Sequence, residues 1–240
     1  MADTSSNLPA QKRSPRISQS NEMTQAAYHL SLQAKRVLWL CFLQVYREND
    51  HDGCFNVRVA DYARFFNVSQ TLASIDVKKG VQALSSNVVT FYMEEGEYEE
   101  RMLPWLSEVG LKRGRGQWTL EFNQKVMPYL VGLTREFTTY NLYDCGKLNS
   151  TRVIRLYESL CQYRSSGIWV TTPKWLAERY QLPESQRQNF AEMRRTFLLP
   201  ALKKISENTP LSAAMTETED GKLVFTITEN KNRLSLVPEL

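Results

Sequence analysis

Basic and apolar side chains lie interspersed along residues 186–206, QRQNFAEMRRTFLLPALKKIS. The apolar positions recur every three or four residues, which gathers them on one side of a helix. They are Phe190, Phe197, Leu198, Ala201, Leu202 and Ile205. The cations beside them are Arg187, Arg194, Arg195, Lys203 and Lys204. Such a face can bind phosphates, and a guanidinium can donate two hydrogen bonds to guanine O6 and N7. A solvated face on a core helix would give the same pattern.

The flanking segments predict a winged helix around this basic stretch. Residues 173–182 form a shorter predicted helix, and residues 183–185 supply a tight break after it. Residues 211–215 and 223–228 alternate apolar and polar around Asp220-Gly221, which is a strong hairpin signal. Helix, turn, helix and hairpin in that order are the elements of a winged helix.

Positive charge is concentrated in the same module. Between Arg164 and Ile205 there are eight Lys or Arg and three Glu, a net charge of +5, whereas the whole chain carries +4. The rest of the protein is therefore close to neutral. A positive field focused on one module is typical of proteins that bind a phosphate backbone.

The first half of the chain predicts the same order of elements. A long helix over 24–46 precedes a strand over 54–59 and two helices over 60–66 and 70–84. A further strand over 88–93 and a hairpin of 102–109 with 117–122 follow. Ser69 can cap the helix over 70–84. The corresponding segments of the second half are 150–163, 168–171, 175–180, 187–206 and 211–228. Tyr62 and Val68 stand at nearly the spacing of Trp175 and Leu182.

This repetition predicts an α+β fold of two tandem winged-helix domains in a pseudo-twofold arrangement. We expect a flexible basic arm over residues 1–21, domain 1 over 22–141, domain 2 over 142–230 and a tail over 231–240. The arm contains the run KRSPR, which either makes supplementary phosphate contacts or is simply a disordered basic segment. The leucines within 24–46 indicate either a zipper or a single core helix.

Composition narrows the class of protein further. With 240 residues and 42% hydrophobic side chains, the chain can bury two modest cores. The longest apolar run, residues 37–43, is too short to span a membrane, and the start lacks a secretory signal, so we expect a cytoplasmic protein. Four cysteines without CxxC spacing and two histidines, His29 and His51, argue against a zinc site and for buried thiols.

Catalysis is not expected. A rolling-circle nickase would need a metal-binding histidine triplet, and two histidines 22 positions apart do not supply it. An ATP-driven initiator would need a GxxxxGK[ST] loop, which the sequence lacks. We therefore predict a protein that is not an enzyme, takes no cofactor and works through binding energy.

Several runs resemble one family of proteins. They are SPRI at 14–17, QSN at 19–21, AAYHLS at 26–31, LYESLCQYR at 156–164, ERYQLP at 178–183 and RRTF at 194–197. Together they resemble the iteron-binding replication initiators of theta-replicating plasmids such as the F plasmid. The likeness covers nearly the whole chain past residue 12. Such runs are more specific than a generic helix-turn-helix.

The resemblance implies two winged-helix domains that clamp double-stranded DNA. In that family, monomers bind directly repeated iterons and help open the origin, while dimers bind an operator inverted repeat and repress their own promoter. The second domain makes the main base contacts, and the first either joins DNA binding or forms the dimer interface. Host DnaA, DnaB helicase and DnaK-type chaperones are the implied partners, and no membrane is involved. A dimeric winged-helix repressor without a replication role is the alternative.

The resemblance also implies site residues in domain 2. Arg194 and Arg195 fall on the family's arginine run in the recognition helix. Glu192 matches an acidic residue of that run. It could accept a hydrogen bond from a cytosine amino group, or its negative charge could stabilise the helix N-terminus through the macrodipole. Arg187 and Asn189 lie near the helix start, and Lys203 on the same helix completes the set.

In domain 1 the resemblance is looser. Ser74 and Lys78 match the equivalent helix, but Ile75 stands where the family has a basic residue. The predicted hairpin tip carries the cations Lys112, Arg113 and Arg115. They suit phosphate contacts, although a solvated turn would give the same pattern. The second wing, residues 216–222, is acidic where the family is basic, so we expect it to contribute little. The acidic run over 94–100 should lie off a DNA-binding face.

Overall fold

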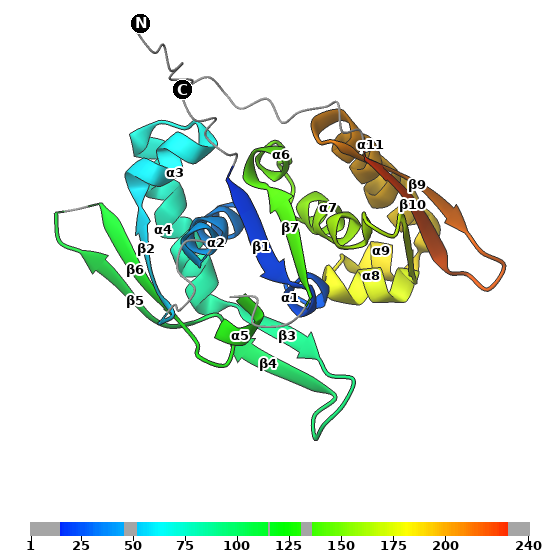
Figure 1. Cartoon of the computed structure of the whole chain (residues 1–240), viewed down its shortest axis with the longest axis horizontal. Coiled ribbons are helices and arrows are strands. Elements are labelled where there is room, and N and C mark those ends of the chain that lie inside the picture. Colours follow the sequence, from blue (N-terminus) through cyan, green and yellow to red (C-terminus); the bar gives the residue numbers. More distant parts are fainter. Residues whose placement is uncertain (1–14, 46–51, 115, 131–135, 230–240) are drawn as a thin grey trace, which may run out of the picture.

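The computed structural model describes residues 15–45, 52–114, 116–130 and 136–229. Two α+β units lie side by side, and strands β1 (Arg16–Ser20) and β7 (Phe137–Asn141) pair antiparallel between them (Figure 1). Ile17, Gln19 and Ser20 of β1 are buried. Residues 16–20 therefore belong to the folded body, which corrects the flexible arm predicted over 1–21; residues 1–14 of that arm lie outside the described residues.

Domain 1 is a winged helix. Its elements in chain order are α2 (Leu32–Val45), β2 (Cys54–Arg58), α3 (Val59–Phe66), α4 (Gln70–Ser86), β5 (Leu106–Lys112) and β6 (Gln117–Phe122). The three strands form an antiparallel sheet in the order β2-β6-β5. Ser69 caps α4, its Oγ accepting from the Leu72 N–H at 3.2 Å, as the sequence predicts.

Domain 2 repeats this plan. After α6 (Leu142–Gly146), its elements are α7 (Thr151–Tyr163), β8 (Ile168–Thr171), α8 (Pro173–Arg179), the recognition segment over 184–208, β9 (Leu211–Glu217) and β10 (Leu223–Glu229). Its antiparallel sheet has the order β8-β10-β9, the counterpart of β2-β6-β5. The predicted α+β fold of two winged helices is confirmed.

The helix-turn-helix turns of the two domains match residue for residue. Among the described residues other than glycine, only Asn67 (φ 49°) and Gln181 (φ 46°) have positive φ, and each follows the first helix of its helix-turn-helix, α3 or α8. The next residue bonds back across the turn in both, from Val68 N–H to the Ala63 carbonyl at 3.1 Å and from Leu182 N–H to the Ala177 carbonyl at 3.0 Å. This register aligns Tyr62 with Leu176, one residue away from the Trp175 that the sequence spacing suggested.

Two predicted elements are each split. The helix over 24–46 is α1 (Asn21–Gln25) and α2, because Ala27 leaves the helix to bridge Thr90 of β3 (Val88–Tyr92). The strand over 102–109 is β4 (Glu100–Pro104), which pairs with β3, and β5, which pairs with β6. Trp105, fully buried between β4 and β5, separates them. β3 and β4 thus form a hairpin inserted between α4 and the wing, and α5 (Met127–Leu130) follows the wing.

Side chains 37–42 of α2 are all buried, which supports the core-helix interpretation over a zipper. One of its charged residues forms an ion pair between the domains. Lys35 Nζ lies 2.7 Å from Glu158 Oε1 of α7, and neither side chain is more than 2% exposed. The Tyr140 hydroxyl donates to the same carboxylate oxygen at 2.5 Å. Burial lowers the pKa of Lys35, but the Glu158 carboxylate outweighs that effect and raises it overall.

Arg155 of α7 forms a second connection between the domains. Its Nη2 donates to the carbonyls of Thr24 at 3.0 Å and Ala26 at 2.7 Å, and its guanidinium lies 3.8 Å from the centre of the Tyr28 ring. With the Lys35–Glu158 pair, this contact holds the first helix of each winged helix in one orientation. Removing Lys35 or Glu158 would leave the charge of the other residue uncompensated in the core.

No helix within the described ranges is long and apolar enough to cross a membrane. Cys41, Cys145 and Cys161 are buried and Cys54 is partly buried, all as free thiols. Burial raises the pKa of the Cys41 thiol, which keeps it protonated at neutral pH. His51 lies outside the described residues.

Candidate nucleic-acid interface

The predicted recognition helix of domain 2 is interrupted at its start. α9 (Glu184–Gln188) ends at Asn189, whose backbone is extended with φ −132° and ψ 104°. Asn189 then caps α10 (Phe190–Met193), its Oδ1 accepting from the Glu192 N–H at 3.1 Å. The helix expected from residue 186 therefore begins at Phe190, because the Asn189 side chain supplies the N-cap.

A π-helical turn, Arg194–Leu198, separates α10 from α11 (Leu199–Asn208). The Leu199 N–H bonds to the Arg194 carbonyl five residues back, instead of four. Pro200 follows, and because proline has no N–H, it cannot continue the regular ladder to Thr196. The wide turn leaves Arg194, Arg195 and Thr196 exposed while Phe197 and Leu198 stay buried.

The two arginines of this turn have different surroundings. Arg195 Nη2 lies 2.7 Å from Glu192 Oε2, with side chains 75% and 33% exposed. The Arg194 side chain is exposed and makes no hydrogen bond or ion pair with another described residue. Because Glu192 lies in the first turn of α10 and orients Arg195, the geometry favours its helix-terminal role over a base contact. Arg194 presents a free guanidinium fork.

The remaining predicted contacts of domain 2 lie outside this turn. Lys203 is exposed on α11, with its Nζ 3.9 Å from Glu207 Oε1. Asn189 uses its side-chain oxygen for the cap. Arg187 is exposed on α9, outside the continuous helix. The structure thus brings Arg194 and Arg195 together and separates Arg187 from them by the break at Asn189.

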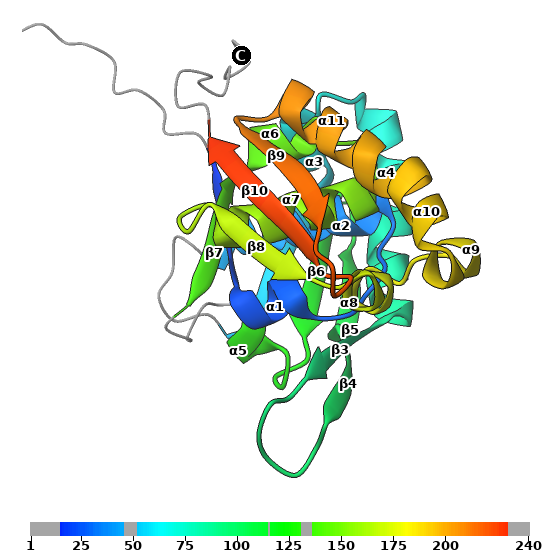
Figure 2. The same cartoon turned by 90° about the vertical axis from the view of Figure 1, so that its right-hand side faces the viewer.

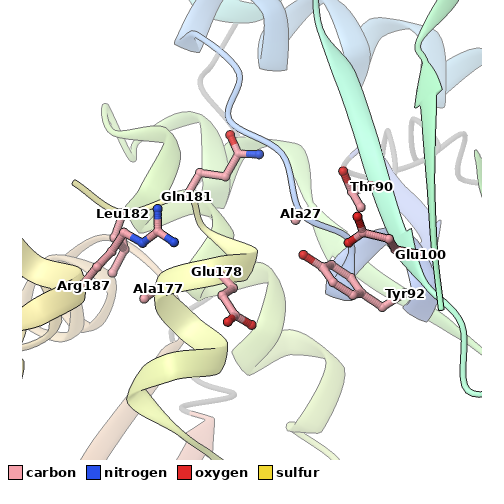
Figure 3. Close-up of a pocket in the computed structure, with 9 residues that line it drawn as sticks. All are labelled: Ala27, Thr90, Tyr92, Glu100, Ala177, Glu178, Gln181, Leu182 and Arg187. Carbon is pink, nitrogen blue, oxygen red and sulfur yellow. The ribbon is translucent and has the colours of Figure 1, made fainter. Parts of the chain in front are cut away.

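Arg187 instead lines a cavity of about 390 Å³ between the domains. Figure 3 shows Arg187, Gln181 and Glu178 of domain 2 across from Tyr92 and Glu100 of the β3–β4 hairpin. Nearby, the Arg179 guanidinium stacks 3.2 Å from the centre of the Tyr92 ring, and burial lowers the pKa of Arg179. Cations and carboxylates are mixed here, so the cavity is less suited to phosphate than the π-helical turn.

In domain 1, α4 occupies the equivalent place. Ser74 and Lys78 are exposed on it, together with Lys79. The one acidic residue of α4, Asp76, is buried and accepts from the Tyr62 hydroxyl at 3.3 Å. Desolvation by burial raises the pKa of Tyr62 to about 12, so it stays a donor. The exposed side of α4 therefore carries positive charge only.

Both recognition elements face one side of the molecule. In Figure 2, α4, α9 and α10 lie along the right-hand edge, whereas the β3–β4 hairpin projects from the bottom. The acidic run over 94–100 belongs to that hairpin, whose projecting end lies away from α4 and α10, whereas Glu100 at its base lines the cavity with Arg187 of α9. One chain thus presents two helix-turn-helix modules to the same surface.

The two wings carry opposite charge. Lys112 and Arg113 are exposed at the tip of β5 and β6, with Lys112 Nζ 3.2 Å from Asn56 Oδ1; Arg115 lies outside the described residues. At the tip of β9 and β10, Asp220 pairs with Lys222 at 2.7 Å. Hydrogen bonds from Lys222 and Thr218 lower the pKa of Asp220, and the nearby Glu217 and Glu219 give this wing a net negative charge.

Sequence reasoning missed three features of this surface. The Thr196 Oγ1 accepts from Gln186 Nε2 at 2.9 Å, which ties α9 to the π-helical turn. Pro200, six residues after Arg194, was the available signal for the wide turn. Lys79 adjoins Lys78 and is also exposed, so it adds to the positive charge of this helix.

Comparison with known proteins places the chain in a family. The protein-family model described as "Initiator Replication protein, WH1" matches residues 16–161, and the family model described as "Initiator Rep protein, WH2" matches residues 172–228. An uncharacterized 27.6 kDa protein of Escherichia coli is 51% identical over 228 residues, covering 90% of this chain and 95% of that protein. An uncharacterized 6.6 kDa protein of Escherichia coli is 61% identical over 56 residues, 23% of this chain and 98% of that protein.

Two solved structures share the fold. The Pi initiator protein in complex with iteron DNA gives a TM-score of 0.75 at 20% identity, over 91% of this chain and 98% of that one. Domains 2 and 3 of RctB give 0.50 at 11% identity, over 82% and 81%. With both winged-helix models matching in order along one chain, the protein belongs to the initiator replication protein family.

Proposed function

We propose that this chain is a plasmid replication initiator that binds directly repeated iterons at its origin as a monomer. The observation that carries the proposal is the placement of α4 and α10 on one side of a single chain, with exposed cations on α4 and on the π-helical turn that follows α10. The chain's likeness to the Pi initiator, whose structure holds iteron DNA, supports it.

The geometry fits a duplex bound across both domains. Recognition helices of helix-turn-helix modules enter the major groove, and modules on one face of DNA contact sites about 10 base pairs apart. The β1–β7 pair and the buried Lys35–Glu158 contact hold the domains together, so both helices approach the same duplex. Arg194 and Arg195 supply base readout, while Lys78, Lys203 and the first wing supply phosphate contacts.

Origin opening follows from assembly in this proposal. Monomers loaded in phase on adjacent repeats bend the DNA, and the bend favours melting of a neighbouring AT-rich tract. As a dimer, the chain binds an inverted repeat and represses its own promoter. Host DnaA, DnaB helicase and DnaK-type chaperones act with it in the cytoplasm. In this proposal the chain contributes binding energy and no catalysis.

A footprint on the DNA flanking the gene tests this proposal. We expect the full-length chain to protect a tandem array of direct repeats, each about two helical turns long. A plasmid carrying that array should replicate only when the chain is supplied. Protection of a lone palindrome, with no effect on replication, would instead identify a dimeric winged-helix repressor. Protection that is insensitive to sequence would contradict both functions.

A further inference from the structure

Two large apolar side chains lie exposed on the recognition helix of domain 1. Leu72 is 45% exposed and Ile75 is 48% exposed, in the first and second turns of α4. Three residues apart on a helix, they are neighbours on one face. No described residue packs over them.

Neither side chain can turn into the core. The opposite side of α4 is already buried through Ala73, Val77, Val81 and Leu84. Gly80 fixes that orientation, since a Cβ there would lie 2.6 Å from the Gln33 carbonyl oxygen of α2. The helix is thus pressed against α2 and holds Ile75 outward.

The surroundings of this apolar pair suit a nucleic acid groove. Lys78 and Lys79 are exposed in the next turn, and the exposed side of α4 carries no carboxylate because Asp76 is buried. N-terminal residues of a recognition helix are the ones that contact base edges. In the major groove, the thymine C5 methyl is the apolar group that such side chains can contact.

We infer that Leu72 and Ile75 read thymine methyl groups in the part of the site bound by domain 1. This inference rests on the proposed DNA-binding function and assigns that domain a readout by apolar contact. A cytosine at the same place would present its amino donor to a hydrocarbon side chain, which leaves the donor without a partner and disfavours that base. Domain 1 therefore selects thymine where domain 2 uses guanidinium groups.

Deoxyuridine isolates the methyl group as the variable. The wild-type full chain first selects its preferred duplex from a random-sequence pool. Each thymine of that duplex is then replaced in turn by deoxyuridine, which removes the methyl group alone, and dissociation constants are measured. We expect one or two replacements to weaken wild-type binding by roughly fourfold each, the value of one buried methyl-sized group.

Variants assign the effect to the two side chains. In Leu72→Ala and Ile75→Ala, the penalty for deoxyuridine should fall below about twofold at the thymine that each residue contacts. Ser85→Ala, exposed at the far end of α4, should keep the full penalty. Ile75→Arg should change the selected base from thymine to guanine. Circular dichroism confirms that each variant is folded.

The outcomes separate this inference from the proposed function. A chain that selects a site but is indifferent to every thymine methyl overturns the inference and leaves the function standing. The same holds if Ile75→Ala changes self-association in sedimentation while the penalty persists, because the apolar pair would then belong to a protein contact. A chain that selects no sequence overturns both.

Discussion

The recognition helices of the two domains occupy equivalent places but expose different side chains. α4 is one continuous helix of 17 residues with Leu72, Ile75, Lys78 and Lys79 outward. Its counterpart is capped anew at Asn189 and widened where Arg194 and Arg195 lie. The wings differ as well, cationic in domain 1 and acidic in domain 2. Two domains of the same fold can thus present different chemistry, with most of the polar side chains suited to base contacts in domain 2.

One duplex can contact both recognition helices only if the two domains are held together, and the buried Lys35–Glu158 pair should contribute most to that. Glu158→Ala leaves the Lys35 ammonium buried without its partner, so we expect the free energy of unfolding to fall by about 3–5 kcal/mol. Urea denaturation measures it. Lys203→Met removes an exposed pair with 3.9 Å between its charged atoms and should change stability by less than about 1 kcal/mol. Equal effects of the two changes would contradict this account.

The close approach of α4 to α2 fixes how domain 1 presents its recognition helix. Gly80→Ala should destabilise the protein by about 1–3 kcal/mol, since the new methyl meets the Gln33 carbonyl. Thermal unfolding checks this. Gly146→Ala is the matched control, because its Cβ would meet nothing within 4 Å. A neutral Gly80→Ala would mean that α4 can shift on α2.

Pro200 tests whether the wide turn matters to domain 2. Pro200→Ala restores an N–H, so we expect the turn to relax toward a regular helix and re-aim Arg194 and Arg195. Specific DNA affinity should fall about tenfold, roughly 1.4 kcal/mol, with stability unchanged or raised. Competitive binding and thermal unfolding measure the two quantities. Pro173→Ala, at the start of α8, should leave affinity unchanged. Unaltered affinity in Pro200→Ala would make the turn incidental.

The wings give the smallest effect. Arg113→Ala should weaken binding to every sequence by a few-fold and reduce the slope of log affinity against log salt by about one. Lys222→Ala, in the acidic second wing, should change neither. Salt titrations of both variants provide the measurement. Loss of sequence preference in Arg113→Ala would show that the first wing reads bases.

Local signals in the sequence predicted most of the fold. The Ser69 cap, the start of α8 at Pro173 and the hairpin at Asp220-Gly221 depend on neighbouring residues, and each lies where expected. The split of the helix over 24–46 was missed because Ala27 leaves it for Thr90, 63 positions away. The Lys35–Glu158 pair was missed because a lysine in a helical sequence gives no sign of burial.

The candidate site was only partly predictable for the same reason. Arg194 and Arg195 follow from the basic amphipathic pattern and the family resemblance. The Asn189 cap is a local signal that competed with a strong helical periodicity. Arg187 lies within that periodicity, and only the extended backbone at Asn189 separates it from the recognition helix. Their roles in DNA binding stay predictions.

Fluorescence anisotropy tests whether the arginines of the π-helical turn sense base identity. Wild type, Arg194→Ala and Arg195→Ala are titrated with the footprinted repeat and with a scrambled duplex, and Lys125→Ala, an exposed cation next to α5, serves as control. We predict that each arginine variant loses about 1–3 kcal/mol on the repeat and little on the scrambled duplex. An equal loss on both duplexes would contradict base readout and reduce both arginines to phosphate contacts.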